Sequence, residues 1–382
     1  MRSVRDGYAF ATLKTEWDAL LDNSRAGLFN SWEWLYPWYR RVGPTVELLI
    51  LTARDERGAL VGVMPLCLST VKAGGRQLRR LGFLGDTHVG SDYLDVVARE
   101  GLEEEVTRAF VEAIFDAHGG WDVLELSDME MGSHTVRALH RACDQTRFQF
   151  SLRERCTCPF ERFAAGEPFD VFLRRTARRD NYLRRKRWLE KQAGFVIERV
   201  EEPGALVRPM TDFFRLHRLR WARDGGSSGI RGPAVEAFHR DAAALLAERG
   251  QVCFFTLRVD GQPLASVYGL VHRDKFIYYQ SGYDPAWRGK SVGLVLVGET
   301  FRAALAAGLR ELDFLRGTEA YKADWTTQVR KTVALRIHAR DGKGAWLSRQ
   351  EESSELFRTI AKRALPAPVV EAIRRVRRRK GP

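Results

Sequence analysis

The alternation of apolar and polar residues predicts an ordered set of helices and strands in the C-terminal half of the chain. Apolar residues recur every three or four positions in 210–221 and 235–247, which predicts two helices. The dipeptide Asp260-Gly261 separates two apolar runs, which is the pattern of a β-hairpin. The elements expected next are a strand at 275–280, a loop at 283–291, a helix ending near Gly308, and strands at 309–315 and 329–339.

The N-terminal half repeats this order. A helical stretch rich in tryptophan, at 16–41, comes before a hairpin, further strands, and a helix at 102–117. The agreement is closest at 120–126 and 308–314, where a glycine ends a helix and a strand follows. We therefore expect two copies of one mixed α/β unit, although this order of elements could also recur by chance. The expected parts are an N-terminal domain at 1–160, a C-terminal domain at 161–345 and a basic helical tail at 346–382.

Composition limits the classes of protein that fit. The chain has 382 residues, 45% hydrophobic and 29% charged, which is typical of a soluble protein with two domains. Its net charge of +13 implies an acidic partner: nucleic acid, anionic lipid or a phosphorylated small molecule. Membrane-spanning and signal-peptide patterns are absent from the sequence, so we expect a cytoplasmic protein. The basic tail leaves weak contact with an anionic membrane, at its inner face, as an open alternative.

A basic segment lies between the two copies, from Arg174 to Lys191. Arginine and lysine recur in it at helical spacing, among phenylalanine, tyrosine and leucine. It is either a solvated helix face or an arm that meets phosphates, with Arg179 as a candidate for binding an anionic substrate. Cysteines and histidines show no metal-ligand spacing, so no metal is expected.

The clearest candidate for chemistry is the loop that precedes the helix expected to begin at Val292 and to end near Gly308. Backbone N–H groups in the first turn of a helix, together with the helix dipole, favour an anion. Glycine allows close approach of the backbone, Ser291 can cap the helix, and the arginine and lysine add positive charge. The sequence therefore predicts a diphosphate site formed by Arg288, Gly289, Lys290, Ser291, Val292 and Gly293.

Two other phosphate-binding patterns fit this loop poorly. A P-loop requires glycine where this chain has Asp284, and a bulky acidic side chain there would obstruct the phosphate cradle. The dinucleotide pattern G-x-G-x-x-G is absent, because Gly289, Gly293 and Gly298 are spaced differently. An acyl-CoA pyrophosphate loop, in contrast, needs a basic residue, small residues and a helix start after a strand, and all are present.

Three segments give the chain a resemblance to a known family. They are Tyr283-Asp284-Pro285, Ser291-Val292-Gly293, and 313–317 continuing through Glu319, Tyr321, Lys322 and Trp325. The segment resembles the GNAT superfamily of acetyltransferases, and more closely its CelD-like branch, which is associated with cellulose and exopolysaccharide biosynthesis and related to Fem-type aminoacyl transferases. The resemblance extends more weakly over 29–333. Val292 stands where the family usually has proline, which adds an N–H donor.

The resemblance implies a mixed α/β fold of tandem GNAT-like domains that uses acetyl-CoA as co-substrate. The strands at 275–280 and 310–315 would separate to admit the pantetheine arm, and Gln280 and Ser281 would offer it backbone groups. Candidate bases are Asp313 and Glu319, and Tyr321 or Tyr283 could protonate the leaving thiolate. Hydrogen bonding at a strand end and aromatic core packing are the structural alternatives for these side chains.

Arg316 and Lys322 flank the expected cleft and suit an anionic acceptor, with surface ion pairing as the alternative. The corresponding helix of the N-terminal copy begins Glu103-Glu104-Glu105, and these carboxylates would repel a pyrophosphate. We therefore expect an acyltransferase that acts on an amine or hydroxyl of a glycan, a glycan precursor or another anionic small molecule. Transfer from aminoacyl-tRNA, and a non-catalytic scaffold in polysaccharide synthesis, are the alternatives.

Overall fold

A computed structural model describes residues 1–73, 75–116, 120–144, 148–222, 229–339, 343 and 346. The tail expected at 346–382 therefore lies outside the described residues, except for Trp346. Within the part of the chain that is described, no helix is both long enough and apolar enough to cross a membrane.

The N-terminal half builds one set of strands and helices. Its elements are β1 (Arg2–Val4), α1 (Gly7–Thr12), α2 (Lys14–Asp22), η1 (Leu28–Asn30), α3 (Trp32–Arg41), β2 (Glu47–Arg54), β3 (Leu60–Ala73), β4 (Arg76–Phe83), β5 (Val97–Ala98), α4 (Glu103–Asp116), β6 (Val123–Glu130), α5 (His134–Asp144) and β7 (Phe148–Arg162). The helix expected at 16–41 is thus divided, because the chain turns through η1 between α2 and α3.

The C-terminal half builds the second set. Its elements are α6 (Phe169–Arg174), α7 (Arg179–Leu189), β8 (Val196–Val200), η3 (Pro203–Ala205), α8 (Val207–Trp221), α9 (Pro233–Glu248), β9 (Val252–Val259), β10 (Gln262–His272), β11 (Lys275–Tyr283), η5 (Pro285–Lys290), α10 (Val292–Ala306), β12 (Glu311–Asp313), α11 (Ala320–Ala323) and β13 (Gln328–Ala339). The expected basic helix is split between α6 and α7.

All strands of the described residues join one mixed sheet. Its order is β1-β2-β3-β4-β6-β13-β7-β12-β11-β10-β9-β8, with β5 paired to β3. Each half has an antiparallel series that ends in one parallel pair, β4 with β6 and β11 with β12. The repeat read from the sequence is therefore visible in the strand order.

The two long central strands are shared between the halves. β13, at the end of the C-terminal half, lies between β6 and β7, while β7 pairs along its last residues with β12. The boundary expected at residue 160 falls inside β7. Each half thus contributes a strand to the sheet of the other, so the pairing of backbone groups holds the halves together.

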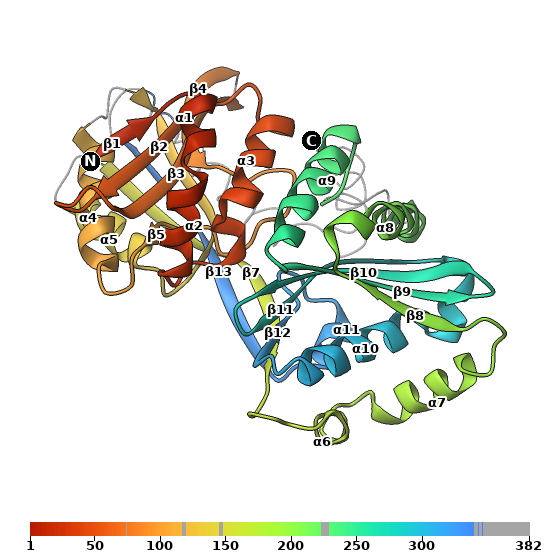
Figure 1. The fold of residues 1–382 in the computed structure, drawn as a ribbon. Coiled ribbons are helices and arrows are strands. Elements are labelled where there is room, and N and C mark those ends of the chain that lie inside the picture. The colour runs from red at the N-terminus through yellow and green to blue at the C-terminus, as the bar shows by residue number, and fades with distance from the viewer. Residues whose placement is uncertain are drawn as a thin grey trace, which may run out of the picture.

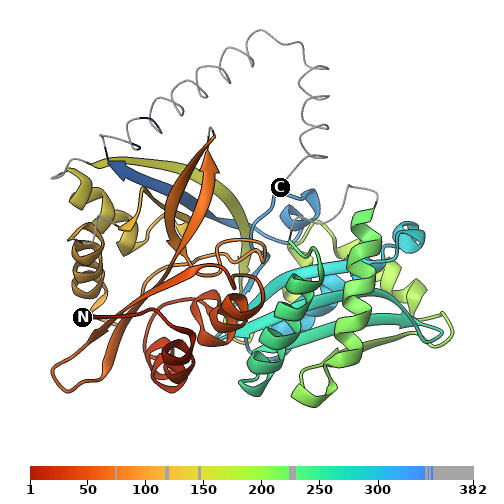
Figure 2. The same ribbon diagram turned by 90° about the horizontal axis from the view of Figure 1, so that it is seen from above.

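Helices cover both faces of the C-terminal part of the sheet. Figure 1 shows α8 and α9 on one face of β9–β11, and α10 with α11 on the other, with α6 and α7 farther out. The view from above in Figure 2 shows the N-terminal half beside α9, continuous with the C-terminal half through the central strands. One apolar core runs from the N-terminal half under α8 and α9, and a second lies beneath α10.

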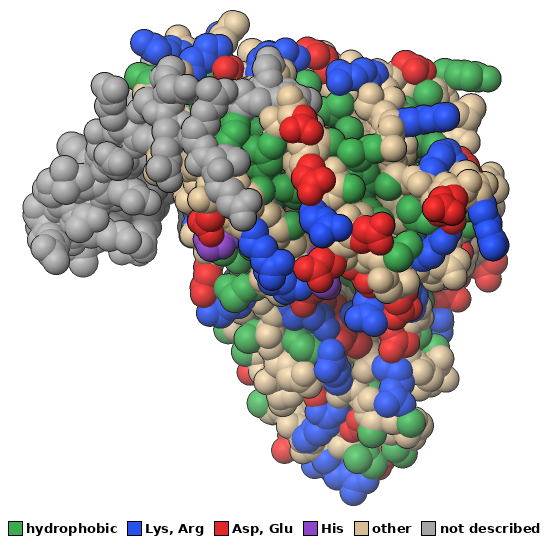
Figure 3. Space-filling view, turned by 90° about the vertical axis from the view of Figure 1, so that its left-hand side faces the viewer, with side chains coloured by type: hydrophobic (Ala, Val, Ile, Leu, Met, Phe, Trp, Pro, Cys, Tyr) green, Lys and Arg blue, Asp and Glu red, His purple; other side chains and the backbone are tan. Residues whose placement is uncertain are grey.

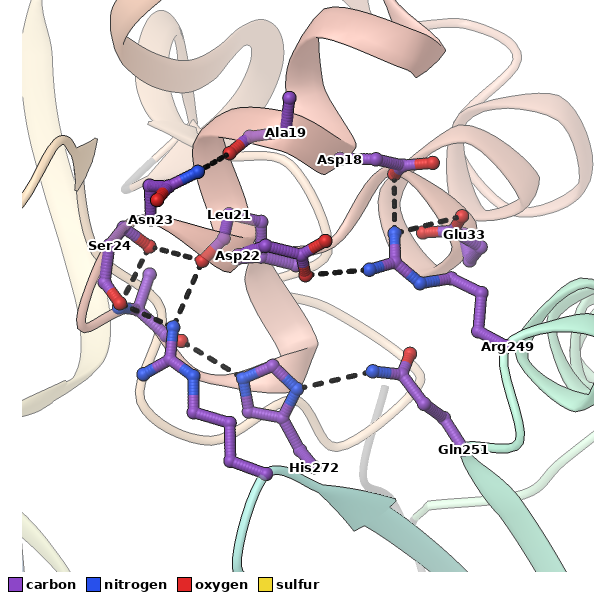
Figure 4. A network of polar contacts seen from close by, with 12 residues as sticks. Asp18, Ala19, Leu21, Asp22, Asn23, Ser24, Glu33, Arg249, Gln251 and His272 are labelled. Atoms are coloured by element: carbon purple, nitrogen blue, oxygen red, sulfur yellow. Dashed lines mark hydrogen bonds and ion pairs between the residues drawn. The ribbon is translucent and has the colours of Figure 1, made fainter.

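Polar contacts join the two halves to each other where α2 meets the C-terminal half (Figure 4). Arg249 forms ion pairs with Asp18 at 2.9 Å and Asp22 at 2.7 Å. Nearby, the imidazole of His272 bridges the carbonyl of Ala26 at 3.2 Å and the side chain of Gln251 at 3.4 Å. Burial lowers the pKa of His272 to about 4, so the ring is neutral at pH 7.

The surface of the N-terminal half mixes both signs of charge. Figure 3, which faces this half, shows Lys and Arg side chains interspersed with Asp and Glu. Since the net charge is +13, this mixing means that the surplus of basic residues is not displayed on this face as one continuous patch.

Candidate active site

The parallel strands β11 and β12 separate after a short pairing. Lys275–Ile277 of β11 pair with β12, which ends at Asp313. Leu315 then adopts a left-handed conformation, with φ of 54°, and the chain leaves the sheet. The remaining part of β11, from Tyr278 to Tyr283, therefore has no strand partner on this side among the described residues, and the expected separation of the two strands is confirmed.

An irregularity in β11 sets which side chains face the gap. Tyr268 of β10 pairs with Gln280 and Gly269 pairs with Tyr278, so Tyr279 is an extra residue in the strand. A bulge of this kind shifts the alternation of side chains by one position. As a result Tyr278 and Ser281 both line the gap.

A pocket of about 380 Å³ lies at this gap. It is lined by Arg178, Asn181, Arg220, Tyr278, Ser281, Tyr283, Arg288, Ser291, Val292, Gly293, Leu294, Val297, Tyr321 and Trp325. The structure thus brings together seven of the predicted site residues: Ser281, Tyr283, Arg288, Ser291, Val292, Gly293 and Tyr321. The predicted residues that do not line it are Gln280, Gly289, Lys290, Asp313, Glu319, Arg316, Lys322 and Arg179.

The N-terminus of α10 opens into the pocket. The first backbone bond into this helix joins Val295 N–H to the carbonyl of Ser291. The N–H groups of Val292, Gly293 and Leu294 belong to the first turn of α10, so they have no acceptor within this helix. All three residues line the pocket, so three donors and the positive end of a helix dipole face a single ligand position.

The expected cap by Ser291 is wrong. Ser291 precedes α10 in a left-handed conformation, with φ of 59° and ψ of 36°, and its side chain makes no capping hydrogen bond. A capping residue is typically extended, which aims its oxygen at the N–H groups ahead. The side chain of Ser291 therefore does not occupy those N–H groups. Asp284 instead caps η5 by accepting a hydrogen bond from Ala286 N–H at 2.9 Å.

The two basic residues of the loop have different surroundings. Arg288 is exposed, lines the pocket and has no acidic partner among the described residues. The ammonium of Lys290 lies 4.5 Å from the ring centroid of Trp188 on α7, which is a cation–π contact. Only Arg288 is therefore placed to meet a ligand in the pocket, while Lys290 joins the loop to α7.

On the opposite wall, two side chains that the sequence did not single out, Arg220 and Tyr278, join the predicted Ser281 and Tyr321. Arg220, near the end of α8, donates to the hydroxyl of Ser281 at 3.0 Å. Burial raises the pKa of Tyr278 to about 12 and also raises the pKa of Tyr321. Both phenols are therefore protonated at neutral pH and can donate hydrogen bonds. Arg220 lies 61 residues from Ser281, and no local motif marks it.

Asp313 lies on the side of the N-terminal half. Its carboxylate accepts hydrogen bonds from Tyr93 Oη at 3.0 Å, Arg330 at 2.8 Å and the backbone N–H of Leu315 at 2.7 Å. Burial raises its pKa to about 6, partly offset by Arg330. These contacts support hydrogen bonding at the strand end, the structural alternative to a catalytic base.

Arg316 and Lys322 are also held by protein groups. Arg316 pairs with Asp92 at 2.8 Å and Asp128 at 3.2 Å, both buried in the N-terminal half. The buried ammonium of Lys322 donates to the carbonyls of Phe314 at 3.1 Å and Arg316 at 2.7 Å. Both side chains thus fasten the loop after β12.

The remaining predicted residues lie around the pocket. Glu319 pairs with Lys322 at 3.0 Å and is partly exposed, and its charge contributes to the raised pKa of Tyr278 and of Tyr321. Arg179 is exposed on α7 and pairs with Asp180 at 3.1 Å. Gln280 contacts His217 of α8, on the other face of β11.

Comparison with known proteins agrees with this geometry. Residues 176–323 match the family model described as an acetyltransferase (GNAT) domain. No curated protein sequence matches the chain.

Similarity to solved structures extends over both halves. The crystal structure of FemX aligns with a TM-score of 0.60 at 12% identity, covering 87% of this chain and 97% of FemX. The C-terminal domain of a putative lysylphosphatidylglycerol synthetase from Agrobacterium fabrum gives 0.54 at 12% identity, covering 91% and 96%. L-PGS from Bacillus licheniformis gives 0.53 at 11%, covering 90% and 96%. The predicted fold class, mixed α/β with tandem GNAT-like units, is confirmed.

Proposed function

We propose that this chain, through its GNAT domain, transfers an acyl group from acetyl-CoA or a related acyl-CoA to an amine or hydroxyl. One observation carries the proposal: the first turn of α10, with Val292, Gly293 and Leu294, opens into a pocket beside an unpartnered strand edge. The N–H groups and Arg288 fit a diphosphate, and the free edge of β11 fits the amides of a pantetheine arm.

The pocket residues suit the later steps of acyl transfer. The acceptor nitrogen or oxygen would attack the thioester carbonyl carbon, the carbon–sulfur bond would break, and the thiolate would take up a proton. The protonated phenols of Tyr278 and Tyr321 are donors for the developing oxyanion or the thiolate. Tyr283 lines the same wall as a further predicted donor.

A base must accept the proton that the acceptor loses. Glu319 is the better placed of the two predicted carboxylates, because it is partly exposed and near enough to Tyr321 to influence its pKa. Asp313 is buried and occupied by three donors of the protein. We therefore propose Glu319 as the base and assign Asp313 a positioning role.

In this proposal the acceptor is a negatively charged molecule. The net charge of +13 supports it, and the resemblance to the CelD-like branch suggests a glycan or a glycan precursor. Arg179 and other basic residues of α7 lie on the same side of the sheet as α10, where they could meet such an acceptor.

A second candidate is transfer of an amino acid from aminoacyl-tRNA. The structural similarity to FemX, an aminoacyl transferase, supports it because the alignment includes both halves of the chain. The basic helix α7 beside the pocket would suit a polyanion whose binding weakens with salt.

Calorimetric titration of the full-length protein with acetyl-CoA tests the proposal. In Gly293→Glu, a carboxylate would occupy the diphosphate position, and we expect binding to weaken by more than about 100-fold through charge repulsion and blocked donors. The substitution suits the helix, since the Cβ of residue 293 would approach only Tyr283, at 3.8 Å. Ala306→Glu, an exposed change at the other end of α10, is the matched control and should bind like wild type.

The outcomes separate the candidates. Absence of acetyl-CoA binding to the wild type, with salt-sensitive binding of aminoacyl-tRNA, would replace the acyl-CoA proposal with the second candidate. Binding of acetyl-CoA that never leads to CoA release with any amine or hydroxyl compound would indicate a non-catalytic scaffold.

A further inference from the structure

Arg220 has unusual surroundings for an arginine in a pocket. Its guanidinium is half-buried, 4.9 Å from the ring centroid of Trp221 and 5.6 Å from that of Tyr283. It donates to the hydroxyl of Ser281 at 3.0 Å and, weakly, to its carbonyl at 3.4 Å. Aromatic stacking and neutral oxygens therefore hold it in a fixed position.

No carboxylate of the described residues forms an ion pair with this guanidinium, although Glu319 lies near the phenols of Tyr278 and Tyr321. Among the described residues Arg220 forms no ion pair, whereas Arg178, which lines the same pocket, is paired with Asp324 through its Nε at 2.8 Å. The phenols of Tyr278 and Tyr321 are kept protonated by burial and so provide no negative charge. A half-buried cation that lacks a direct ion-pair partner is unfavourable, and a ligand anion would supply that partner.

The position of Arg220 separates it from the diphosphate site. Tyr283 is a neighbour of both: the guanidinium of Arg220 lies 5.6 Å from its ring centroid, and its Cδ1 lies 3.8 Å from the Cβ position of residue 293. Ser281, the hydrogen-bond partner of Arg220, precedes Tyr283 by two residues, roughly 7 Å along the strand. A ligand that fills the pocket thus meets positive charge at two separate places.

We infer that Arg220 binds a carboxylate carried by one of the two reactants, close to the acyl group that is transferred. The carboxylate would belong either to the acyl chain, as in a dicarboxylic acyl-CoA, or to the amine acceptor. This inference rests on the proposed acyl-CoA function and adds a charged group to its substrates. The planar guanidinium can form two parallel hydrogen bonds with such a carboxylate.

Two titrations of the full-length protein distinguish the sources. The donor arm compares succinyl-CoA with acetyl-CoA. The acceptor arm titrates CoA-saturated protein with β-alanine and with β-alaninamide, which lacks the carboxylate. Each arm is repeated with Arg220→Met, which keeps much of the apolar stem, and with Arg218→Met. Arg218 lies on the same helix, pairs with Glu236 at the surface and does not line the pocket.

We expect the carboxylate-bearing ligand of one arm to bind about 10- to 100-fold more tightly than its uncharged counterpart. Arg220→Met should abolish that preference, and Arg218→Met should retain it. If neither arm shows a preference, or if Arg220→Met weakens acetyl-CoA and succinyl-CoA equally, the inference is wrong, because Arg220 then serves the CoA moiety or the fold. If neither CoA ester binds the wild type, the proposed function itself fails.

Discussion

The two halves of the chain place a helix at the same point of a repeated unit, yet the two helices begin in opposite ways. α10 has no acidic residue in its first turn, which lines the pocket together with Arg288. α4 begins with Glu103, Glu104 and Glu105, and Glu103 accepts a hydrogen bond from Gly101 N–H at 2.9 Å. A helix N-terminus that supplies its own carboxylates is stable without a ligand, whereas one that lacks them is stabilised by an external anion.

The halves also differ in what covers their sheets. In the C-terminal half α7 packs against α10, where Tyr182 donates to the buried Glu299 at 2.5 Å and Lys186 pairs with it at 2.9 Å. In the N-terminal half an open groove of about 400 Å³, lined by β1–β4 and the end of α4, lies beside the sheet. The extra helices thus enclose the half that carries the pocket, and the N-terminal half mainly supports it.

The largest expected effect tests that supporting role. Arg316→Met would leave Asp92 and Asp128 of the N-terminal half buried without their shared arginine. We expect a loss of about 3–5 kcal/mol in the free energy of unfolding, measured by chemical denaturation, because a buried charge without its partner is strongly unfavourable. Arg310→Met, at an exposed position, should change stability by less than about 0.5 kcal/mol. Unchanged stability with lost CoA release would return Arg316 to its predicted substrate-binding role.

The next largest effect is a loss of folding stability at acidic pH. Burial lowers the pKa of His217 and of His272 to about 4, and that of His239 to about 3, and all three lie in the C-terminal half. The unfolded chain takes up protons below pH of about 6.5 while these buried rings do not. Their contribution to stability is therefore complete above pH 6.5 and is lost as the pH falls toward their folded pKa values.

His239→Phe tests whether a buried histidine of the C-terminal half causes this loss of stability in acid. Both ring nitrogens of His239 lack partners among the described residues, and the ring packs against Trp34 and Phe238, so phenylalanine fits the surroundings. We expect the variant to lose about 3 kcal/mol less stability than wild type between pH 7 and pH 4. Amide hydrogen exchange should show protection failing first in the C-terminal half of the wild type. Equal acid sensitivity of the variant and the wild type would contradict the assignment.

The sequence predicted those features that depend on local pattern. The helix–strand order, the 288–293 loop and the separation of β11 from β12 follow from hydrophobic spacing, turn residues or family resemblance. The exchange of β7 and β13 could not be predicted, since an apolar strand satisfies the same pattern in either half of a sheet. Ser291 was misjudged because its left-handed backbone, which decides the cap, has no local signal.

Long-range contacts account for the remaining differences. Arg220 reaches Ser281 from a distant helix, and Asp313 meets Tyr93 across the boundary between the halves. Tyr278 joins the pocket wall because of the bulge at Tyr279, which depends on the pairing with β10. Each of these contacts is set by packing between elements that local sequence patterns do not report.

A smaller effect is expected from substitutions at the start of α4, and it tests how α4 differs from α10. Replacing Glu103, Glu104 and Glu105 with glutamine removes the carboxylates at α4. We expect about 1–2 kcal/mol of lost stability, from weaker interaction with the helix dipole and from loss of the ion pairs with Arg25 and Arg141. We expect no second acetyl-CoA site in calorimetry, because Glu100 keeps a carboxylate on Arg25 at that end of the helix. A stoichiometry of two acetyl-CoA molecules per chain would show that the glutamates alone distinguish the halves.

The smallest effect separates the two basic residues of the loop. Arg288→Met removes a charge that faces the pocket, so we expect acetyl-CoA to bind about tenfold more weakly, with a smaller salt dependence. Lys290→Met removes a cation–π contact with Trp188 instead, worth about 0.5–1 kcal/mol, and should weaken acetyl-CoA binding less than about threefold while lowering thermal stability slightly. Calorimetry at two salt concentrations measures both variants. Equal weakening by the two changes would mean that Lys290 leaves Trp188 when the donor binds, so that both residues contact the diphosphate. The α10 end of the pocket would then carry two cations, and it would differ even more from the acidic start of α4.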